Sequence, residues 1–395
     1  MNQNAIRFEH VDVVFGQNAP QAVSLLDQGL GRDAILDKTA CLVAVHDASV
    51  FVNEGEILVL MGLSGSGKSS LLRCVNGLNT VTRGKVLVND GNQQVDVASC
   101  DPETLRRVRR NRISMVFQQF GLMPWLTVRD NVGFGLDIRG VSKAERDRIV
   151  DDKIKLVRLD KFANKFTHEL SGGMQQRVGL ARAFATEADI LLMDEPFSAL
   201  DPLIREHLQD ELIELQQKLK KTIVFVSHDL DEALKIGNRI AIMESGRIVQ
   251  VGTPEEIVTA PANEYVANFV ANVNPLNVLR GSTLMRPLRQ LERHGDWIVI
   301  DAVSGMRCRL DEVDMPVAVL ENGVERPVVR VKDGSMPTPG AVCADAADLP
   351  MRRAVELVHA THRPVILVDG DGRMVGVIAG EEIVQGLLRQ ERLPA

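Results

Sequence analysis

The chain has 395 residues and a formal net charge of −7. This acidic balance argues against nucleic acid as the main partner, because a protein that binds a phosphate backbone usually carries a basic surface. The five cysteines are odd in number and never spaced as Cys-x-x-Cys. We therefore expect neither a disulfide framework nor a zinc site. The length allows two or three domains.

The chain shows neither an apolar signal segment at its first residues nor an apolar run near the ~18 residues that a membrane span requires. We therefore expect a chain that is soluble by itself and that reaches any membrane through a partner.

The N-terminal part predicts strands interrupted by an inserted helical stretch. Residues 6–15 alternate apolar and polar side chains, which is typical of a strand. Residues 16–40 are expected to be helical. Residues 42–45 and 48–52 then predict two further strands.

A phosphate-binding loop follows the short apolar run at residues 57–61, which predicts a buried strand. The Gly-x-x-x-x-Gly-Lys-Ser pattern and the residue after it are Gly62, Leu63, Ser64, Gly65, Ser66, Gly67, Lys68, Ser69 and Ser70. Lys68 is expected to reach the outer phosphates of a nucleotide and Ser69 to ligate a magnesium ion. A chance glycine-rich turn is the alternative, which the flanking strand and helix disfavour.

The strand expected at residues 113–117 ends in Gln118. Ligands of open α/β sheets bind at the carboxyl ends of the strands, so Gln118 is a candidate contact to the metal or to an attacking water. A surface amide is the alternative reading. The apolar loop that follows contains Met123, Pro124 and Trp125, which form either an exposed partner-docking patch or a buried plug.

Two adjacent glycines stand at the start of another expected helix. Ser171 is an N-cap candidate, and Gly172 and Gly173 expose backbone N–H groups just ahead of Gln175. The segment is therefore either a second anion site or only a helix cap.

Acidic residues follow the apolar strand expected at residues 190–193. Asp194 can hold magnesium directly or through water, and Glu195 beside it can polarise a water. Asp201 lies in the tight turn before the next helix. His228 follows the next apolar strand; a lone histidine there is more often structural, but this one is the fourth polar group expected at one sheet edge.

The sequence changes character near residue 273, and residues 274–395 carry no catalytic constellation. Residues 350–388 predict a helix, two strands paired around the turn 369–372, and a closing helix. This order indicates a compact α+β unit.

Together, residues 1–273 resemble the ATP-binding subunit of an ABC transporter. In chain order the matching motifs are Walker A (62–69), the Q-loop (Gln118), the signature (170–176), Walker B (190–195), the D-loop (198–201) and the H-loop (His228). The signature is decisive, because other P-loop classes lack it. The resemblance implies an α/β P-loop NTPase with a RecA-like core sheet, an antiparallel β subdomain and a helical subdomain at about 120–180.

The resemblance also implies roles within one chain. Lys68 and the loop N–H groups bind the phosphates of ATP, and Ser69, Gln118 and Asp194 contact Mg²⁺. Glu195 is the general base and His228 contacts the γ-phosphate, so these two and Gln118 are the implied catalytic residues.

Other motifs are implied to act between two copies of the chain. Ser171, Gly172, Gly173 and Gln175 would complete the nucleotide site of a second copy, with the D-loop residue Asp201 nearby. Two chains are therefore expected to close head to tail around two ATP molecules. The resemblance identifies no adenine-stacking residue, because the only tyrosine is Tyr265.

The finer resemblance is to importers of quaternary amines such as glycine betaine, proline betaine, carnitine and choline. The segments that carry it are residues 21–40, 61–64, 121–124 and 198–205, and residues 117–125 with 274–280 are most similar to the choline branch. Residues 274–395 resemble a CBS-like regulatory domain, with a degenerate first repeat at about 276–340 and a second at about 345–390.

This resemblance implies an ATPase that energises uptake through separate permease subunits at the cytoplasmic face of the inner membrane. Met123, Pro124 and Trp125 would dock on the permease, and a periplasmic or surface substrate-binding protein would be an indirect partner. A soluble ABC protein of ribosomes or DNA usually has two cassettes or an inserted coiled coil. A non-catalytic regulator would lack Glu195 or His228, but both are present.

Overall fold

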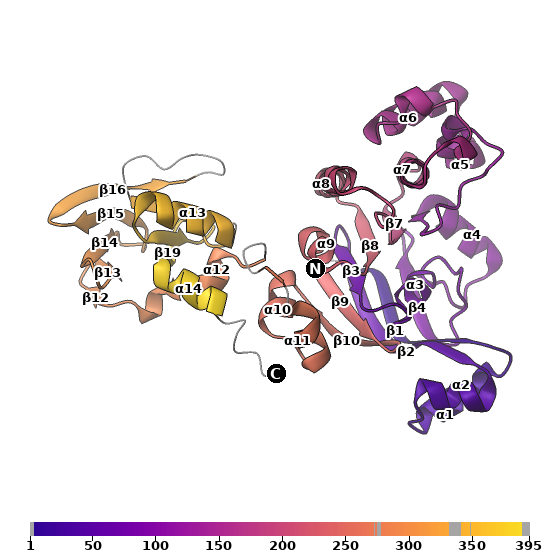
Figure 1. The fold of residues 1–395 in the computed structure, drawn as a ribbon, viewed down its shortest axis with the longest axis horizontal. Helices are drawn as coiled ribbons and strands as arrows, with labels where there is room; N and C mark the ends of the chain where they lie inside the picture. The colour runs from indigo at the N-terminus through magenta and orange to yellow at the C-terminus, as the bar shows by residue number, and fades with distance from the viewer. Residues whose placement is uncertain (1–3, 272, 275–277, 332–340, 348, 389–395) are drawn as a thin grey trace. The chain divides into compact units, whose positions relative to one another are not determined.

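The computed structural model describes residues 4–271, 273–274, 278–331, 341–347 and 349–388. The chain forms two compact units, Met1–Ile257 and Val258–Ala395 (Figure 1). The expected boundary near residue 273 follows the end of the nucleotide motifs, whereas packing divides the chain earlier, within helix α10 (Pro254–Thr259). None of the helices in the described part of the chain has the length and apolar character needed to cross a membrane.

The first unit is built on a six-stranded sheet of order β10-β9-β3-β8-β7-β6. Its strands are β3 (Ile57–Met61), β6 (Ile113–Val116), β7 (Ile190–Asp194), β8 (Thr222–Ser227), β9 (Arg239–Glu244) and β10 (Arg247–Gly252). All neighbours are parallel except the β9–β10 hairpin. Strands β3, β7 and β8 are buried along their whole length, which explains why they are apolar except for Asp194, Thr222 and Ser227 at strand ends. The expected strands are confirmed.

A four-stranded antiparallel sheet of order β2-β1-β4-β5 covers the phosphate-loop side of the first unit's core. It contains β1 (Asn4–Phe15), β2 (Leu42–Asn53), β4 (Arg83–Asn89) and β5 (Gln94–Asp96). The two strands expected at 42–45 and 48–52 are one strand. Its middle carries a bulge at Asp47, whose φ is 51°, and both His46 and Asp47 bond to the buried Asp12. These bonds to Asp12 keep the polar residues His46 and Asp47 within the antiparallel pairing of β1 and β2.

The insertion between β1 and β2 is helical, as expected, and forms two helices, α1 (Ala19–Asp27) and α2 (Arg32–Thr39). The pair has a small core of its own, formed by Val14, Ala22, Leu26, Ile35, Cys41 and Val43. Arg83 on β4 bonds to Asp27 at the end of α1 and to Asp12 on β1. Apolar packing and this ion-pair bridge hold the insertion against the antiparallel sheet.

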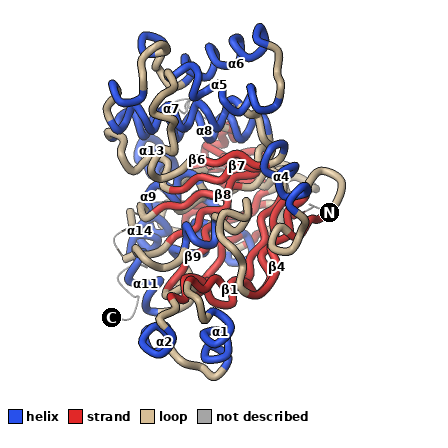
Figure 2. Tube along the Cα trace, turned by 90° about the vertical axis from the view of Figure 1, so that its right-hand side faces the viewer, coloured by secondary structure: helices blue, strands red, loops and turns tan. Residues whose placement is uncertain are grey.

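The remaining helices of the first unit include the helical subdomain expected at about 120–180. They are α3 (Lys68–Leu72), α4 (Pro102–Asn111), α5 (Val128–Arg139), α6 (Lys143–Leu156), α7 (Gly172–Ala185), α8 (Pro202–Leu219) and α9 (Leu230–Ile236). In the view of Figure 2, α5, α6 and α7 lie above the edge strand β6 and its neighbour β7, and α1 and α2 lie below β1. The α4 helix begins after Asp101, because the Asp101 side chain accepts hydrogen bonds from the N–H groups of Glu103 and Thr104.

The second unit carries a nine-stranded sheet of order β11-β19-β18-β17-β16-β15-β14-β13-β12. Its strands are β11 (Arg286–Pro287), β12 (Arg293–His294), β13 (Trp297–Asp301), β14 (Met306–Leu310), β15 (Pro316–Glu321), β16 (Val324–Arg330), β17 (Ala341–Asp345), β18 (Val365–Val368) and β19 (Met374–Ile378). Its helices are α11 (Glu264–Val270), α12 (Gly281–Leu284), α13 (Met351–Thr361) and α14 (Gly380–Leu388). The expected order of α13, two antiparallel strands and α14 is confirmed.

The stretch expected to be a degenerate first repeat folds differently. Among its described residues the only helix longer than three residues is the single turn α12, and β12 to β16 form an antiparallel meander. The reason is a period of two: Ile298, Ile300, Met306 and Cys308 are buried and alternate with more exposed neighbours. That apolar face packs on β17–β19, while α13 and α14 form the other cluster of the unit. Residues 275–277 belong to the segment 274–280 that resembles the choline branch, and they lie outside the described residues.

Candidate nucleotide-binding and active site

The phosphate loop leaves the carboxyl end of β3 and ends where α3 begins. Three glycines in it have φ values that other residues rarely adopt: 145° at Gly62, 78° at Gly65 and 98° at Gly67. A side chain at Gly67 would place its first carbon 2.2 Å from the carbonyl oxygen of Ala44 on β2. The loop is therefore shaped by packing against the antiparallel sheet as well as by its own turn.

Lys68 is buried inside this loop. Its Nζ donates to the carbonyl oxygens of Gly62 at 2.7 Å and Leu63 at 2.9 Å. Burial lowers the pKa of Lys68, and the charges of Glu195 and Asp194 oppose that shift. A buried ammonium held mainly by carbonyl dipoles gains most from an anion, which agrees with the expected phosphate contact.

Asp194 ends β7 and is fully buried. Ser69 Oγ donates to its Oδ1 at 2.6 Å, and Arg73 Nη2 pairs with its Oδ2 at 2.8 Å. The predicted neighbourhood of Ser69 and Asp194 is confirmed, and hydroxyl and carboxylate oxygens are ligands that fit Mg²⁺. Sequence reasoning missed Arg73, although its position four residues after Ser69 places both on one helix face.

Glu195 brings the other predicted polar groups together. Its Oε2 accepts from Gln118 Nε2 at 3.2 Å and lies 3.3 Å from His228 Nδ1. Its backbone has a φ of 47°, a strained value for a residue with a side chain, and its N–H donates to Val226 on β8. The strained turn aims a carboxylate at the sheet edge between an amide and an imidazole, where a base for a water molecule can act.

The start of α7 carries the expected signature residues. Ser171 Oγ accepts from the N–H of Met174 at 3.4 Å, which confirms the predicted N-cap, and Ser171 and Gly172 are exposed. Gln175 instead donates to the carbonyl oxygens of Thr167 and Leu170 of its own loop. Its amide group therefore stabilises the segment before the helix.

Sequence reasoning also missed Gln176, a buried residue of the same helix. Its Nε2 donates to the carbonyl oxygen of Glu195 at 3.2 Å, and its Oε1 accepts from the N–H of Ala199 at 3.1 Å. Asp201 accepts from the N–H of Ile204 and caps α8. The amide of Gln176 thus joins the signature helix to the turn that holds the candidate base.

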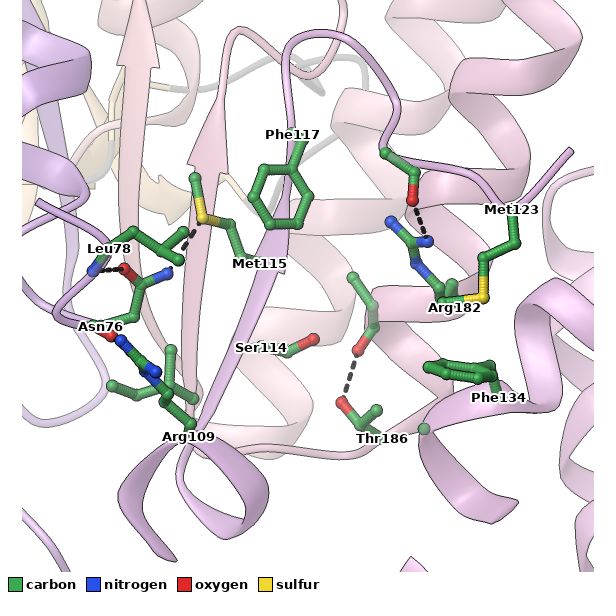
Figure 3. Close-up of a pocket in the computed structure, with 14 residues that line it drawn as sticks. Asn76, Leu78, Arg109, Ser114, Met115, Phe117, Met123, Phe134, Arg182 and Thr186 are labelled. Atoms are coloured by element: carbon green, nitrogen blue, oxygen red, sulfur yellow. Dashed lines mark hydrogen bonds between the residues drawn. The ribbon is translucent and has the colours of Figure 1, made fainter. Parts of the chain in front are cut away.

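The loop after Gln118 leads to the expected docking residues. Trp125 is 71% exposed, so the buried-plug alternative is wrong, and Pro124 is also exposed. Met123 is partly buried beside a cavity of about 390 Å³ between β6, α5 and α7, drawn in Figure 3.

Two guanidinium groups lie at this cavity, and no carboxylate is among the residues that line it. Arg182 donates to the carbonyl oxygens of Phe120 and Gly121, and burial lowers its pKa. Arg109 donates to the carbonyl oxygens of Asn76 and Gly77. With Phe117, Met115 and Phe134 around them, the cavity combines apolar walls and positive charge (Figure 3).

The phosphate loop, the buried Ser69–Asp194 pair and Glu195 at one sheet edge define a P-loop ATPase. Residues 45–198 match the family model described as ABC transporter. The chain is 52% identical over 273 residues to the glycine betaine/proline betaine transport system ATP-binding protein ProV of Escherichia coli, an alignment that covers 69% of this chain and 67% of that protein. The chain belongs to the ATP-binding subunits of ABC transporters and is an ABC ATPase.

Two further comparisons bear on the length of the match and on the fold. The glycine betaine/carnitine transport ATP-binding protein GbuA of Listeria monocytogenes is 41% identical over 394 residues, 98% of each chain. The dimeric ATP-binding cassette MJ0796, solved in a post-hydrolysis state with ADP and Pi, superposes with a TM-score of 0.54 at 30% identity. That superposition covers 63% of this chain and 98% of the other.

Proposed function

We propose that this ATPase energises import of a small quaternary ammonium solute, such as glycine betaine or choline, through separate permease subunits. The observation that carries the proposal is the match to GbuA, a glycine betaine/carnitine transport protein, along almost the whole of both chains. The chain then works as a peripheral protein on the cytoplasmic side of the membrane, and the solute is selected by the permease and by a substrate-binding protein.

In this proposal one chain supplies the base and the phosphate loop. Lys68 and the loop N–H groups bind the β- and γ-phosphates, Glu195 takes the proton of the attacking water, and Gln118 and His228 position that water and the γ-phosphate. Ser69, Asp194 and Gln118 hold Mg²⁺, which neutralises phosphate charge when it is bound.

A second copy of the chain completes each site in this proposal. The exposed N-terminus of α7, with Ser171, Gly172 and Gly173, offers hydroxyl and N–H donors to the nucleotide of the partner. The dimeric state of the similar MJ0796 cassette supports the pairing of two chains.

The permease docks, we infer, at Trp125 and the cavity beside Met123. Trp125 is exposed and follows Met123, which lines the cavity, by two residues, and an exposed tryptophan is typical of an interaction site. The guanidinium groups of Arg182 and Arg109 favour a docking segment that is apolar and carries a carboxylate.

Uptake by cells that lack the chain tests which solute the transporter imports. Cells are supplied with the wild-type chain or with Glu195→Gln, and entry of labelled glycine betaine and of labelled choline is measured. Uptake of at least one of them is expected only with the wild-type chain. Equal uptake of both with and without the chain would contradict a role in quaternary amine import.

A further inference from the structure

The α1–α2 insertion reaches the phosphate loop. Arg32, the first residue of α2, extends its side chain so that Nη2 lies 3.5 Å from the carbonyl oxygen of Gly65. This is the outer limit of a hydrogen bond. Its Nε is covered from solvent and has no hydrogen-bond partner in the described part of the chain.

The insertion is held firmly where it approaches the loop. Ile35, one turn after Arg32, is fully buried in the small core beneath the two helices. Asp27 at the end of α1 pairs with Arg83 of β4 at 2.7 and 2.9 Å. Arg32 therefore approaches the loop from a braced helix, and the position of its charge is set by packing.

The charge of Arg32 is left without a matching anion. Among the described residues it forms no ion pair, whereas Arg83 of the same region contacts both Asp12 and Asp27. A guanidinium carries five N–H donors in a planar fork that matches phosphate oxygens. Here a single donor makes one long contact, beside a loop whose residues 63–65 are exposed.

We propose that Arg32 donates to the phosphate chain of the bound nucleotide, so that the inserted helices form one wall of the ATP site. The proposal rests on the nucleotide role of the phosphate loop. Lys68 binds from inside the loop and Arg32 from its rim, which gives the phosphates two cations on different elements. Arg32 is then a binding residue of the first unit that belongs to none of the six motifs.

Nucleotide titrations of the full-length chain at fixed ionic strength test this inference. Dissociation constants for ATP, ADP, AMP and GTP are measured by calorimetry for the wild type, Arg32→Gln and Arg32→Lys. Lys38→Ala is the matched control, because it removes a positive charge from the exposed end of the same helix. Thermal unfolding shows whether each variant remains folded.

Loss of one charge-assisted contact should weaken ATP, GTP and ADP by about tenfold in Arg32→Gln, and AMP by less. Arg32→Lys should recover part of the loss, and Lys38→Ala should match the wild type. Unchanged affinities in folded Arg32→Gln would overturn the proposal. A loss that depends on the base and not on the number of phosphates would also overturn it, in favour of stacking on the base.

Lys68→Ala separates this inference from the proposed site itself. If Lys68→Ala weakens ATP binding and Arg32→Gln does not, only the role of Arg32 is wrong. If neither variant weakens binding, the assignment of the phosphate loop fails as well. Should Arg32→Gln unfold, Arg32→Lys gives the answer, because it keeps the charge but loses the planar fork.

Discussion

The two units use charged residues in opposite ways. In the first unit Lys68, Asp194, Glu195 and His228 converge on the carboxyl ends of three neighbouring parallel strands. In the second unit the charges form pairs near the surface, as Glu321 does with Arg326 and Arg363, and the apolar faces of the sheet are packed on both sides. Charged residues that gather at a partly buried sheet edge indicate a catalytic or binding site. Charged residues that form ion pairs near the surface mainly orient the strands that carry them.

Two relatives align with different lengths of this chain. ProV aligns with 273 residues of this chain, while GbuA aligns with 394. An alignment that covers 98% of this chain includes both units, so the similarity to GbuA extends over the first unit and the second. Perturbing one unit at a time tests whether their functions are separable.

The largest effect is expected for Glu195→Gln. The variant keeps the hydrogen-bonding shape of Glu195 but cannot accept a proton, so kcat should fall about 10³-fold while ATP still binds. Phosphate release measures the rate, and gel filtration with ATP should show a trapped dimer. Normal hydrolysis by this variant would remove Glu195 from its role as base.

Much of the first unit could be predicted from sequence because its strands are apolar runs that end in polar residues. The placement of Gln118, Asp194, Glu195 and His228 at one edge follows from parallel pairing. The contacts of Arg73 and Gln176 could not be predicted, because each depends on the distance between a helix and a neighbouring strand.

The second unit was predictable only where helix and strand signals alternate. Residues 351–388 have clear signals of both kinds, and the expected elements are confirmed. The meander of β12 to β16 was missed, because short alternating stretches such as 306–310 specify a strand but not its partner. Pairing there is decided by which apolar face covers β17–β19.

A smaller effect is expected when the core of the second unit is damaged. Leu367→Ala on β18 removes a fully buried side chain and should lower the free energy of unfolding by about 2–5 kcal/mol. Urea unfolding measures the loss, and the KM for ATP should not change. Leu60→Ala on β3 is the matched variant, because Leu60 is equally buried but precedes the phosphate loop. An equal rise of KM in both variants would show that the units are coupled.

Trp125→Ala should act on docking and leave the cassette intact. Because Trp125 is 71% exposed, the free energy of unfolding should change by less than about 0.5 kcal/mol. Loss of an aromatic anchor should weaken permease binding by about 2 kcal/mol, and solute uptake should fall with it. Normal uptake together with a destabilised cassette would contradict the docking assignment.

The smallest effect concerns pH. Burial raises the pKa of Glu232, although hydrogen bonds from Ser227 and Gln209 oppose the shift. Because the folded pKa lies above the unfolded value of 4.5, stability is lost as pH rises from that value through the folded pKa. Glu232→Gln removes this loss, so the variant should be more stable than the wild type at neutral pH and equally stable at pH 4. Thermal melts against the exposed Glu206→Gln measure it; a gain independent of pH would contradict the titration.

The carbonyl oxygen of Ala44 restricts which sequences this fold can accept. It lies 2.2 Å from where a side chain at Gly67 would begin and 3.0 Å from the corresponding point at Gly246. Both glycines also have positive φ values, 98° and 84°. One backbone atom of β2 therefore closes position 67 to every other residue type and crowds position 246, and changes of the Ala44 side chain cannot relieve either contact. In a saturation library selected for ATP hydrolysis, position 67 should return only glycine and position 246 should return mainly glycine.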